Sequence, residues 1–452
     1  MWYLLYNALL IAISPVILLV LLSKQRCRRG LPQRLGLASE ATGRSTADGP
    51  PVVIWIHAVS LGEVVAVVPL VRRLRDRYSH ARLVVSTVTE TGREAVEQRL
   101  AGIAEHRYAP LDFSWVVEQA LDQVRPNLYL FVETELWPNI LRALRRRGIP
   151  SILVNGRLST RSYERQRLPV IRDFYRTMLS MVDVCLMQSD RDAQRVIDLG
   201  ADKSRVRCTG NIKFDQPMPT ASASGTTVSR ASLGVGEKER LFVAGSTHPG
   251  EEDVLIAAYR TLTEEFPDLL LVLAPRHIER ASQVEEALRA AGLPVFRRSQ
   301  GDGRMPGTGP RAMVLDTRGE LALLYRDAAV SLVGGTLVPI GGHNLLEPSA
   351  WGTPVLFGPY TDHCAEVAGL LVQSGGGRVV HTADELIRAV ASLLRDPAAA
   401  RHMGESAREV VRRNQGALER TLDVISSYLP IESPHLGTAE GAVVERSERR
   451  RP

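Results

Sequence analysis

The stretch VVIWIHAVSLGEVVAVVPLVRRLRDRY, residues 52–78, decides the fold class of this chain. Residues 52–57 form an apolar run with the length of a buried strand, and residues 64–78 mix apolar and basic positions as an amphipathic helix does. A buried strand that leads directly into a helix is half of a βαβ unit, in which successive strands pair in parallel. The stretch therefore predicts an α/β protein built on a parallel sheet.

The same alternation continues along the chain in two series, separated by the small, polar segment MPTASASGTTVSRAS (218–232). Strands of the first series are expected at 52–57, 82–88, 127–133, 151–155 and 184–189. Strands of the second are expected at 241–245, 269–275, 312–316, 329–335 and 354–359, with closing helices within 383–395 and 398–428.

This layout predicts two Rossmann-like domains, residues 50–217 and 238–428, joined by a linker at 218–237. Two such halves in one chain are the arrangement of the GT-B glycosyltransferases. Ligands of open α/β sheets bind at the carboxyl ends of the strands, so we expect the site in an inter-domain cleft, formed by the loops that follow the strands.

The N-terminus predicts a membrane anchor. Trp2 to Leu22 contains no charged residue, and its 21 residues would make a helix of about 31 Å, enough to cross a hydrocarbon core. Basic residues follow at Lys24, Arg26, Arg28, Arg29 and Arg34, which places the rest of the chain in the cytoplasm by the positive-inside rule. A cleaved signal peptide fits less well, because its charge would precede the apolar run. A spanning helix and a monotopic one remain alternatives.

We therefore divide the chain into an anchor at 1–22, a basic linker at 23–49, the two domains with their linker, and a disordered tail at 429–452. The 452 residues suffice for two cores, and a net charge of +6 favours anionic partners, whether membrane, nucleic acid or phosphorylated substrate. The four cysteines show no CxxC pair or metal-ligand spacing.

Three motifs of the first series carry candidate catalytic residues. In HAVSLGE (57–63), Glu63 either completes a capping box with Ser60 or acts as a general base. In ETELWPN (133–139), Glu133 and Glu135 would share a face if the strand extended that far; they are either catalytic or favourable charges at a helix start. In GNIKFD (210–215), Lys213 either stabilises developing negative charge or is an ordinary surface residue.

The second series carries candidate anion-binding segments. GSTHPGEE (245–252) places Ser246, Thr247 and His248 between a strand and a helix start, where free amides suit an anion. The next strand ends in Pro275 and Arg276, and the planar guanidinium of an arginine matches phosphate geometry.

The longest glycine-rich signal is VGGTLVPIGGHNLLEPSAWGTPVLFGP (333–359). Its glycines permit close approach to a phosphate, and a helix start at Asn344 would present free amides. Glu347 either accepts ribose hydroxyls or merely complements the helix dipole. The segment is neither GxGxxG nor a P-loop, which disfavours dinucleotide oxidoreductases and P-loop enzymes. The DRD at 190–192 matches a DxD metal motif, but its place at a helix start favours capping.

Taken in order, these segments closely resemble the Kdo (3-deoxy-D-manno-octulosonic acid) transferases of lipopolysaccharide synthesis, from the anchor to about residue 428. The resemblance rests on HAVSLGE, ETELWPN, VNGRLSTRS (154–162), TGNIKFD (209–215), AGSTHPGEE (244–252), APRH (274–277) and GGTLVPIGGHNLLEP (334–348).

The resemblance implies a GT-B enzyme of the inner membrane that inverts the anomeric centre without metal or other cofactor. It implies CMP-Kdo as donor, the lipid A precursor lipid IVA as acceptor, and no nucleic acid partner. Glu63 would be the base, and Glu133 and Lys213 would stabilise the transition state. The CMP-binding segments would be Pro275 and Arg276, then Arg318, Gly319 and Glu320, then Asn344, Leu345, Leu346 and Glu347.

Two other classes of function stay open on the sequence. One is a different GT-B enzyme, such as a UDP-sugar transferase or a sugar-nucleotide epimerase. The other is a membrane-bound nucleotide-binding protein without catalysis, for which Glu63→Ala would leave function intact. No motif sets the number of Kdo units transferred, the acyl pattern of the acceptor or the oligomeric state.

Overall fold

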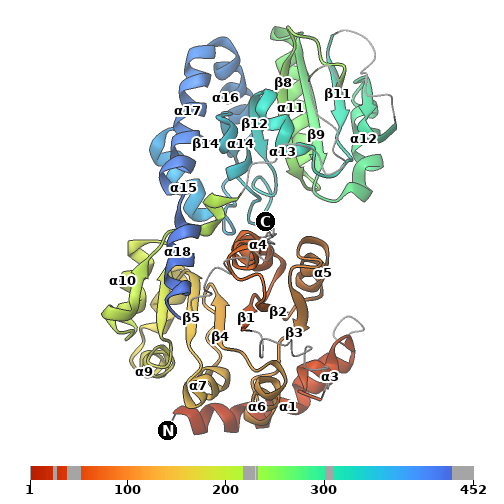
Figure 1. Ribbon diagram of the computed structural model, residues 1–452. Helices are drawn as coiled ribbons and strands as arrows, with labels where there is room; N and C mark the ends of the chain where they lie inside the picture. The colour runs from red at the N-terminus through yellow and green to blue at the C-terminus, as the bar shows by residue number, and fades with distance from the viewer. Residues whose placement is uncertain are drawn as a thin grey trace, which may run out of the picture. The chain divides into compact units, whose positions relative to one another are not determined.

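The computed structural model describes residues 2–23, 28–37, 52–216, 230, 233–300 and 309–429. The chain forms two compact units: residues 1–209 with 418–452, and residues 210–417 (Figure 1). Most of the expected linkers at 23–49 and 218–237, and nearly all of the tail at 429–452, lie outside the described residues.

The first unit is a seven-stranded parallel sheet in the order β3-β2-β1-β4-β5-β6-β7. Its strands are β1 (Val53–His57), β2 (Arg82–Thr87), β3 (Glu105–Tyr108), β4 (Leu128–Val132), β5 (Ser151–Gly156), β6 (Val184–Met187) and β7 (Val206–Cys208). Its helices are α1 (Trp2–Ser23), α3 (Leu31–Arg34), α4 (Leu61–Arg77), α5 (Glu90–Arg99), α6 (Ser114–Val124), α7 (Pro138–Arg147), α8 (Thr160–Gln166), α9 (Pro169–Leu179), α10 (Asp190–Asp198), the 3₁₀ turn η1 (Lys203–Arg205) and α18 (Ala417–Ser426).

The second unit is also a seven-stranded parallel sheet, in the order β10-β11-β9-β8-β12-β13-β14. Its strands are β8 (Arg240–Thr247), β9 (Leu269–Pro275), β10 (Val295–Arg297), β11 (Arg311–Val314), β12 (Ala328–Val333), β13 (Val355–Phe357) and β14 (Gly377–Val379). Its helices are α11 (Glu251–Glu265), α12 (Ala281–Ala290), α13 (Leu321–Leu324), α14 (Leu346–Trp351), α15 (Ala365–Ser374), α16 (Ala383–Arg395) and α17 (Pro397–Asn414), with 3₁₀ turns η2 (Ile212–Asp215), η4 (Ile278–Arg280), η5 (Arg298–Gln300) and η6 (Tyr325–Asp327).

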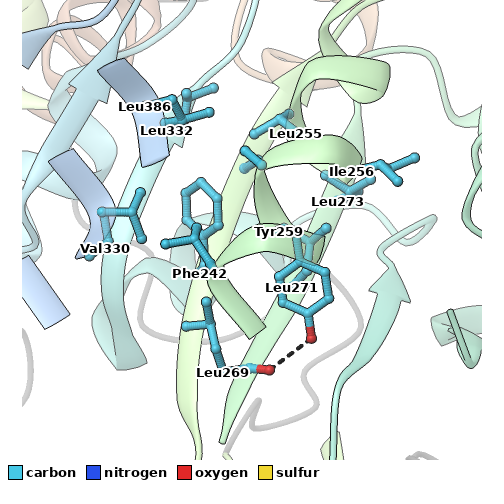
Figure 2. Packing of buried hydrophobic residues seen from close by; sticks show 14 of the residues in the cluster. Phe242, Leu255, Ile256, Tyr259, Leu269, Leu271, Leu273, Val330, Leu332 and Leu386 are labelled. Carbon is cyan, nitrogen blue, oxygen red and sulfur yellow. Dashed lines mark hydrogen bonds between the residues drawn. The ribbon is translucent and has the colours of Figure 1, made fainter. Parts of the chain in front are cut away.

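The core of the second unit shows why its sequence folds this way. Leu255 and Tyr259 stand one turn apart on α11 and pack on Phe242 and Leu271 of the adjacent strands β8 and β9 (Figure 2). The Tyr259 hydroxyl donates to the backbone oxygen of Leu269 at 2.8 Å, so this buried polar group is satisfied. Continuous apolar strands covered by amphipathic helices thus confirm the predicted α/β class.

Each sheet has a topological switch point, where two neighbouring strands send their following helices to opposite faces. In the first unit it lies between β1 and β4, and in the second between β8 and β12. Such points open a crevice at the carboxyl ends of the strands. The candidate residues that follow β1, β4, β8 and β12 therefore occupy the position where this fold binds ligands.

The unit boundary differs from the expected one at both ends. The segment after Thr209 belongs to the second unit, because Asn211 donates to Glu366 at 2.8 Å and Asp215 accepts the amide of Gly416 at 2.6 Å. The closing helix expected at 398–428 is split near Gly416, whose φ of 86° ends it.

The part after that glycine, α18, belongs to the first unit. Arg77 of α4 donates to Ser426 at 2.9 Å, and Arg420 donates to the backbone oxygen of Thr209 at 2.9 Å. The described part of the chain thus returns, with α18, to the unit that contains α1.

Candidate active site

Glu63 lies in the first turn of α4, directly after β1, and is almost fully buried. One carboxylate oxygen accepts the amide of Val59 at 2.9 Å, and the other accepts the hydroxyl of Ser60 at 3.0 Å. Glu63 thus satisfies a backbone donor, as its capping role implied, but Ser60 at the N-cap makes no side-chain capping hydrogen bond, so the capping box is not completed. The two contacts leave each oxygen with further accepting capacity, so capping does not consume the carboxylate.

The surroundings of Glu63 raise the pKa of its carboxyl group into the range that suits proton transfer. Burial raises its pKa to about 7, against the hydrogen bond from Val59, and the charges of Glu133 and Glu135 raise it further. Three carboxylates therefore gather at the switch point of the first sheet. A carboxylate with a pKa near neutral pH is suited to accept a proton and release it again.

Glu133 is held in an unusual backbone conformation. Strand β4 ends at Val132, and Glu133 adopts a φ of 59°, which is rare for a residue with a side chain. The strand therefore does not extend through Glu135, and the two carboxylates are not related by strand alternation. Left-handed non-glycine residues cluster at functional sites, where the surrounding structure holds them in place.

A layer of polar and aromatic residues beside this acidic group was not predicted from the sequence. His57 at the end of β1 contacts Ser86 at 3.0 Å, and burial lowers its pKa to about 4, so it is neutral at pH 7. The Trp137 ring meets His57 edge-on with centroids 6.2 Å apart and donates to Glu135 at 3.0 Å. Trp137 thus positions one member of the acidic group.

In the second unit, Ser246 and Thr247 end β8 at the other switch point. Ser246 has a φ of 57°, again a left-handed residue with a side chain, and Thr247 donates to Glu252 at 2.9 Å. A side chain at Gly334 would lie 2.4 Å from the backbone oxygen of Ser246, so β8 and β12 approach closely only because residue 334 is glycine.

The glycine-rich loop after β12 is held by Glu251, which was not among the predicted site residues. Its fully buried carboxylate accepts four backbone amides: those of His248 at 2.9 Å, Gly335 at 2.8 Å, Thr336 at 3.1 Å and Leu337 at 2.9 Å. The sequence suggested that glycines here bring the backbone to a phosphate. In the structure these three loop amides are bound by a carboxylate of the protein, which a phosphate would have to displace.

A cluster of cationic and imidazole groups lies beside this loop. The rings of His248 and His343 stack with centroids 5.0 Å apart, and their Nε2 atoms are 2.8 Å apart. Burial lowers the pKa of His343 to about 4, helped by the charge of Arg276, and burial lowers that of His248 as well. Arg276 also lies next to β8, since its amide donates to Thr247. Of the predicted residues, Ser246, Thr247, His248, Pro275 and Arg276 are therefore brought together.

The other predicted binding segments are engaged in local contacts. Glu320 is buried and binds Arg298 at 2.9 Å and the hydroxyl of Thr317, while Arg318 and Gly319 are exposed. The amide group of Asn344 donates to Glu347 at 3.1 Å, and its oxygen accepts the amide of Leu346, so that amide is not free.

Three further interpretations of the sequence can be compared with the contacts in the structure. Leu345 and Leu346 belong to a hydrophobic cluster, which leaves only their backbone for a ligand. Lys213, half-buried in η2, lies in the second unit, whereas the sequence placed it at the end of the first domain. In the DRD segment, the cap of α10 is Ser189 and not one of the two aspartates, and Asp192 instead accepts the amide of Leu158 at 2.9 Å.

Comparisons with known proteins agree with this organisation. Residues 29–216 match the family model described as 3-Deoxy-D-manno-octulosonic-acid transferase (kdotransferase). The 3-deoxy-D-manno-octulosonic acid transferase of Haemophilus influenzae is 36% identical over 95% of this chain and 99% of its own length. That of Bordetella pertussis is 34% identical over 90% of this chain and 95% of its own length.

A solved structure shows how widely the fold itself is shared. The UDP-GlcNAc 2-epimerase from Neisseria meningitidis bound to UDP-GlcNAc superposes with a TM-score of 0.57 at 12% identity, over 83% of this chain and 100% of that chain. Because transferases and epimerases share the fold, fold alone does not separate them. The two Kdo transferases that match over at least 90% of this chain at more than 30% identity do separate the two classes of enzyme. The chain therefore belongs to the Kdo transferase family of GT-B glycosyltransferases.

Proposed function

We propose that this enzyme transfers Kdo from CMP-Kdo to lipid IVA, with inversion and without a metal ion. The observation that carries the proposal is the buried Glu63, whose pKa of about 7 suits a general base at the switch point of the first sheet. A carboxylate with a raised pKa at the ligand-binding edge of the sheet supports catalysis over nucleotide binding alone.

The proposed chemistry balances without a cofactor. The oxygen of an acceptor hydroxyl bonds to the anomeric carbon of Kdo, and the Glu63 carboxylate accepts the proton of that hydroxyl. The bond from that carbon to the phosphate oxygen breaks, and CMP leaves as an anion from the opposite face, which inverts the centre. We assign stabilisation of the leaving phosphate to Arg276 and Lys213, and place Glu133 on the acceptor side with Glu63.

We propose metal independence because CMP can leave as an anion that positive groups of the protein stabilise. Positive side chains and backbone amides can neutralise a departing phosphate in place of a metal. We expect EDTA to leave the initial rate of transfer within about twofold of the untreated rate. Strong inhibition that Mg²⁺ or Mn²⁺ reverses would contradict this mechanism.

Incubation with CMP-Kdo and lipid IVA, with the products resolved by mass, tests the function directly. We expect the acceptor to gain the mass of one or more Kdo units, with release of CMP. UDP-N-acetylglucosamine is the matched control donor, since the epimerase of the same fold binds it. Turnover of that donor without turnover of CMP-Kdo would identify a different GT-B enzyme.

We further propose that α1 attaches the enzyme to the inner membrane, with both units in the cytoplasm. Of the described helices, only Trp2–Ser23 is long and apolar enough to cross a membrane. The basic residues that follow it support the cytoplasmic orientation.

A further inference from the structure

Helix α1 presents two different faces along its whole length. Half-buried or buried positions recur every three or four residues, at Tyr3, Asn7, Leu10, Ser14, Ile17 and Leu21. This spacing marks one stripe of a helix that lies against protein. The remaining surface is apolar and exposed, with Leu4, Leu5, Leu9, Ile11, Ile13, Val16, Leu18, Leu19, Val20 and Leu22.

The N-terminal end of α1 is bound to the first unit by specific contacts. The Tyr6 hydroxyl donates to the buried carboxylate of Asp112 at 2.9 Å, and Asn7 exchanges hydrogen bonds with Asn139 at 3.1 and 3.0 Å. Trp2 and Tyr6 both contact the ring of Phe174 on α9. Asp112 in turn accepts the first amides of α7, so α1 is connected through Asp112 to a helix that packs on the sheet.

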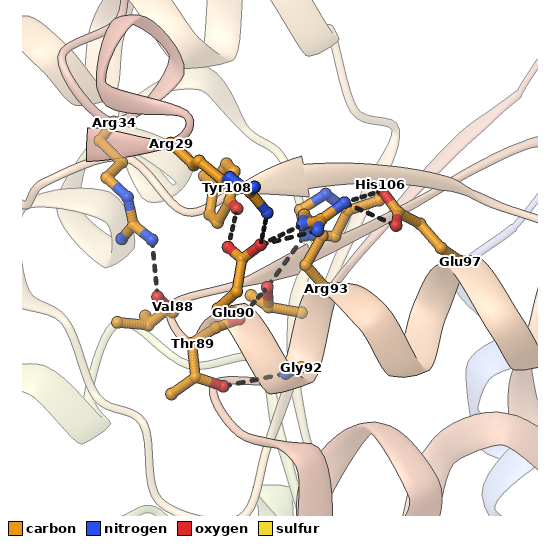
Figure 3. Close-up of polar contacts among 11 residues, drawn as sticks. Arg29, Arg34, Val88, Thr89, Glu90, Gly92, Arg93, Glu97, His106 and Tyr108 are labelled. Atoms are coloured by element: carbon orange, nitrogen blue, oxygen red, sulfur yellow. Dashed lines mark hydrogen bonds and ion pairs between the residues drawn. The ribbon is translucent and has the colours of Figure 1, made fainter. Parts of the chain in front are cut away.

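The chain that follows α1 is bound to the same unit. Arg34 of α3 donates to the backbone oxygen of Val88 at 2.7 Å, and Arg29 pairs with Glu90 at 3.1 Å; Tyr108 also donates to Glu90 (Figure 3). Only the residues from 24 to 28 separate Ser23 from this network, a reach of at most about 20 Å. Both ends of α1 are therefore attached to one folded unit.

This attachment conflicts with a helix that crosses the bilayer. A span of 22 residues would place its two ends about 33 Å apart, on opposite sides of the hydrocarbon. The first unit would then have to enter the bilayer, together with the arginines of α7 and the acidic residues of α6, at a high cost in charge burial. Figure 1 shows α1 running beneath α7 and α6 instead of projecting away from them.

We propose that α1 is an in-plane anchor: it lies along one leaflet of a bilayer that contains anionic lipids, with its apolar face among the acyl chains. This inference rests on the proposed membrane attachment and specifies how α1 is oriented relative to the bilayer. The polar side that an interfacial helix needs is supplied here by the domain beneath α1 and not by charges of its own.

The surface next to α1 has the composition that a lipid interface requires. Trp2, half-exposed at the start of α1, supplies an aromatic ring with a polar edge, which is favoured at the level of the headgroups. Val170 is 62% exposed and stands one turn before Phe174 on α9, so it lies beside the first turn of α1. The exposed Arg172 and Arg176 of the same helix add positive charge, which complements anionic headgroups, although Asp173 pairs with Arg176 at 4.0 Å and offsets part of it.

The in-plane position has a consequence for the acceptor. Asp112 and Asn139 follow the carboxyl ends of β3 and β4, the same edge of the sheet at which Glu63 follows β1. An anchor fixed at that edge keeps Glu63 near the level of the headgroups. A lipid acceptor can then present its sugar hydroxyl while its acyl chains remain in the leaflet.

The test compares the sidedness of the two termini in the full-length enzyme. One epitope is placed before Met1 and another after Pro452, and protease is added to spheroplasts and to inside-out inner-membrane vesicles. We expect both epitopes to be protected in spheroplasts and cleaved in the inside-out vesicles, with the protein in the membrane fraction. Cleavage of only the N-terminal epitope in spheroplasts would show a spanning helix and overturn the in-plane anchor, while the proposed function would stand.

A second measurement tests the apolar face itself. Leu9 and Leu19 are 57% and 68% exposed, and the double variant Leu9→Glu/Leu19→Glu should lose binding to phosphatidylglycerol-containing vesicles by at least about a hundredfold. The matched control is Val372→Glu on α15, which is 48% exposed in the second unit and should bind as the parent does.

Transfer to a detergent-dispersed acceptor separates this inference from the proposed function. The Leu9→Glu/Leu19→Glu variant should retain that activity, because its substitutions face away from the domain. A parent enzyme that remains free of vesicles and self-associates through α1 would overturn the anchor. Absence of transfer in the parent would instead contradict the proposed function, whatever the vesicles show.

Discussion

Replacing Glu63 with glutamine is expected to give a folded enzyme whose rate of Kdo transfer is lower by about 10²- to 10⁴-fold, the usual contribution of a general base. Glutamine keeps the length of the side chain and one oxygen for the contacts with Val59 and Ser60. It cannot accept the proton of an acceptor hydroxyl. A rate within tenfold of the parent, with the fold confirmed by circular dichroism, would reduce Glu63 to a helix cap.

The pH dependence gives a second signature of the same residue. Only the ionised carboxylate can act as the base, and burial raises its pKa to about 7. Transfer by the parent should therefore rise with pH through about 7 and level off above it. Glu135→Gln is the matched control: it removes a neighbouring charge that raises the pKa of Glu63, so this rise should move to lower pH while the plateau is kept.

Stability should change in the opposite direction to activity. The pKa of Glu63 in the folded protein is above its ordinary value, so the protonated form is favoured there. Its stabilising contribution is present below pH 4.5 and is lost as the pH rises through about 7. Glu63→Gln should therefore be more stable than the parent at pH 8, by up to about 3 kcal/mol, and equal to it at acid pH. Thermal denaturation at both pH values measures the difference.

The sequence predicted ten of the strands, and the four that it missed share one property. They are β3, β7, β10 and β14, which form the two edges of each sheet. Their sequences EHRY, VRC, VFR and GRV are short and partly polar, since an edge strand is covered less and needs fewer apolar residues. Central strands can be predicted from their continuous apolar residues, whereas these edge strands form because they pair with a neighbouring strand of the sheet.

The candidate site was predictable in position but not in detail. Glu63, Ser246 and Arg276 lie at or just after the carboxyl ends of strands, and the α/β pattern alone directs attention to them. The left-handed backbone of Glu133 and the partners of Glu320 depend on tertiary contacts that local patterns do not encode. The same is true of Lys213, which the sequence placed in the first domain but which folds with the second through the contacts of Asn211 and Asp215.

Replacing Glu251 with alanine should have the largest effect on stability. The change leaves four backbone amides without their acceptor in a buried place, at about 1–3 kcal/mol each. The sum is comparable to the whole stability of a typical domain, so we expect the second unit not to fold. Glu251→Gln should be milder and cost about 2–6 kcal/mol, because its NH₂ group faces two of the four amide donors.

Hydrogen exchange locates the effect within the second unit. In Glu251→Gln the amides of Gly335, Thr336 and Leu337 should lose protection, while peptides of the first unit should exchange as in the parent. Glu264→Gln on the same helix is the matched control, because Glu264 is exposed at the far end of α11. Unchanged protection in Glu251→Gln would mean that other contacts fix the loop.

Donor affinity decides between two roles for the glycine-rich loop. If its amides were a phosphate site that Glu251 occupies in competition, removing the negative charge would strengthen CMP binding. If Glu251 instead shapes the loop, CMP binding to Glu251→Gln should weaken, because His248 shares the same carboxylate and stacks on His343 beside Arg276. We expect weaker binding by calorimetry, since a buried carboxylate with four amide donors is a completed structural unit, and an incoming phosphate would have to displace it at the cost of all four hydrogen bonds.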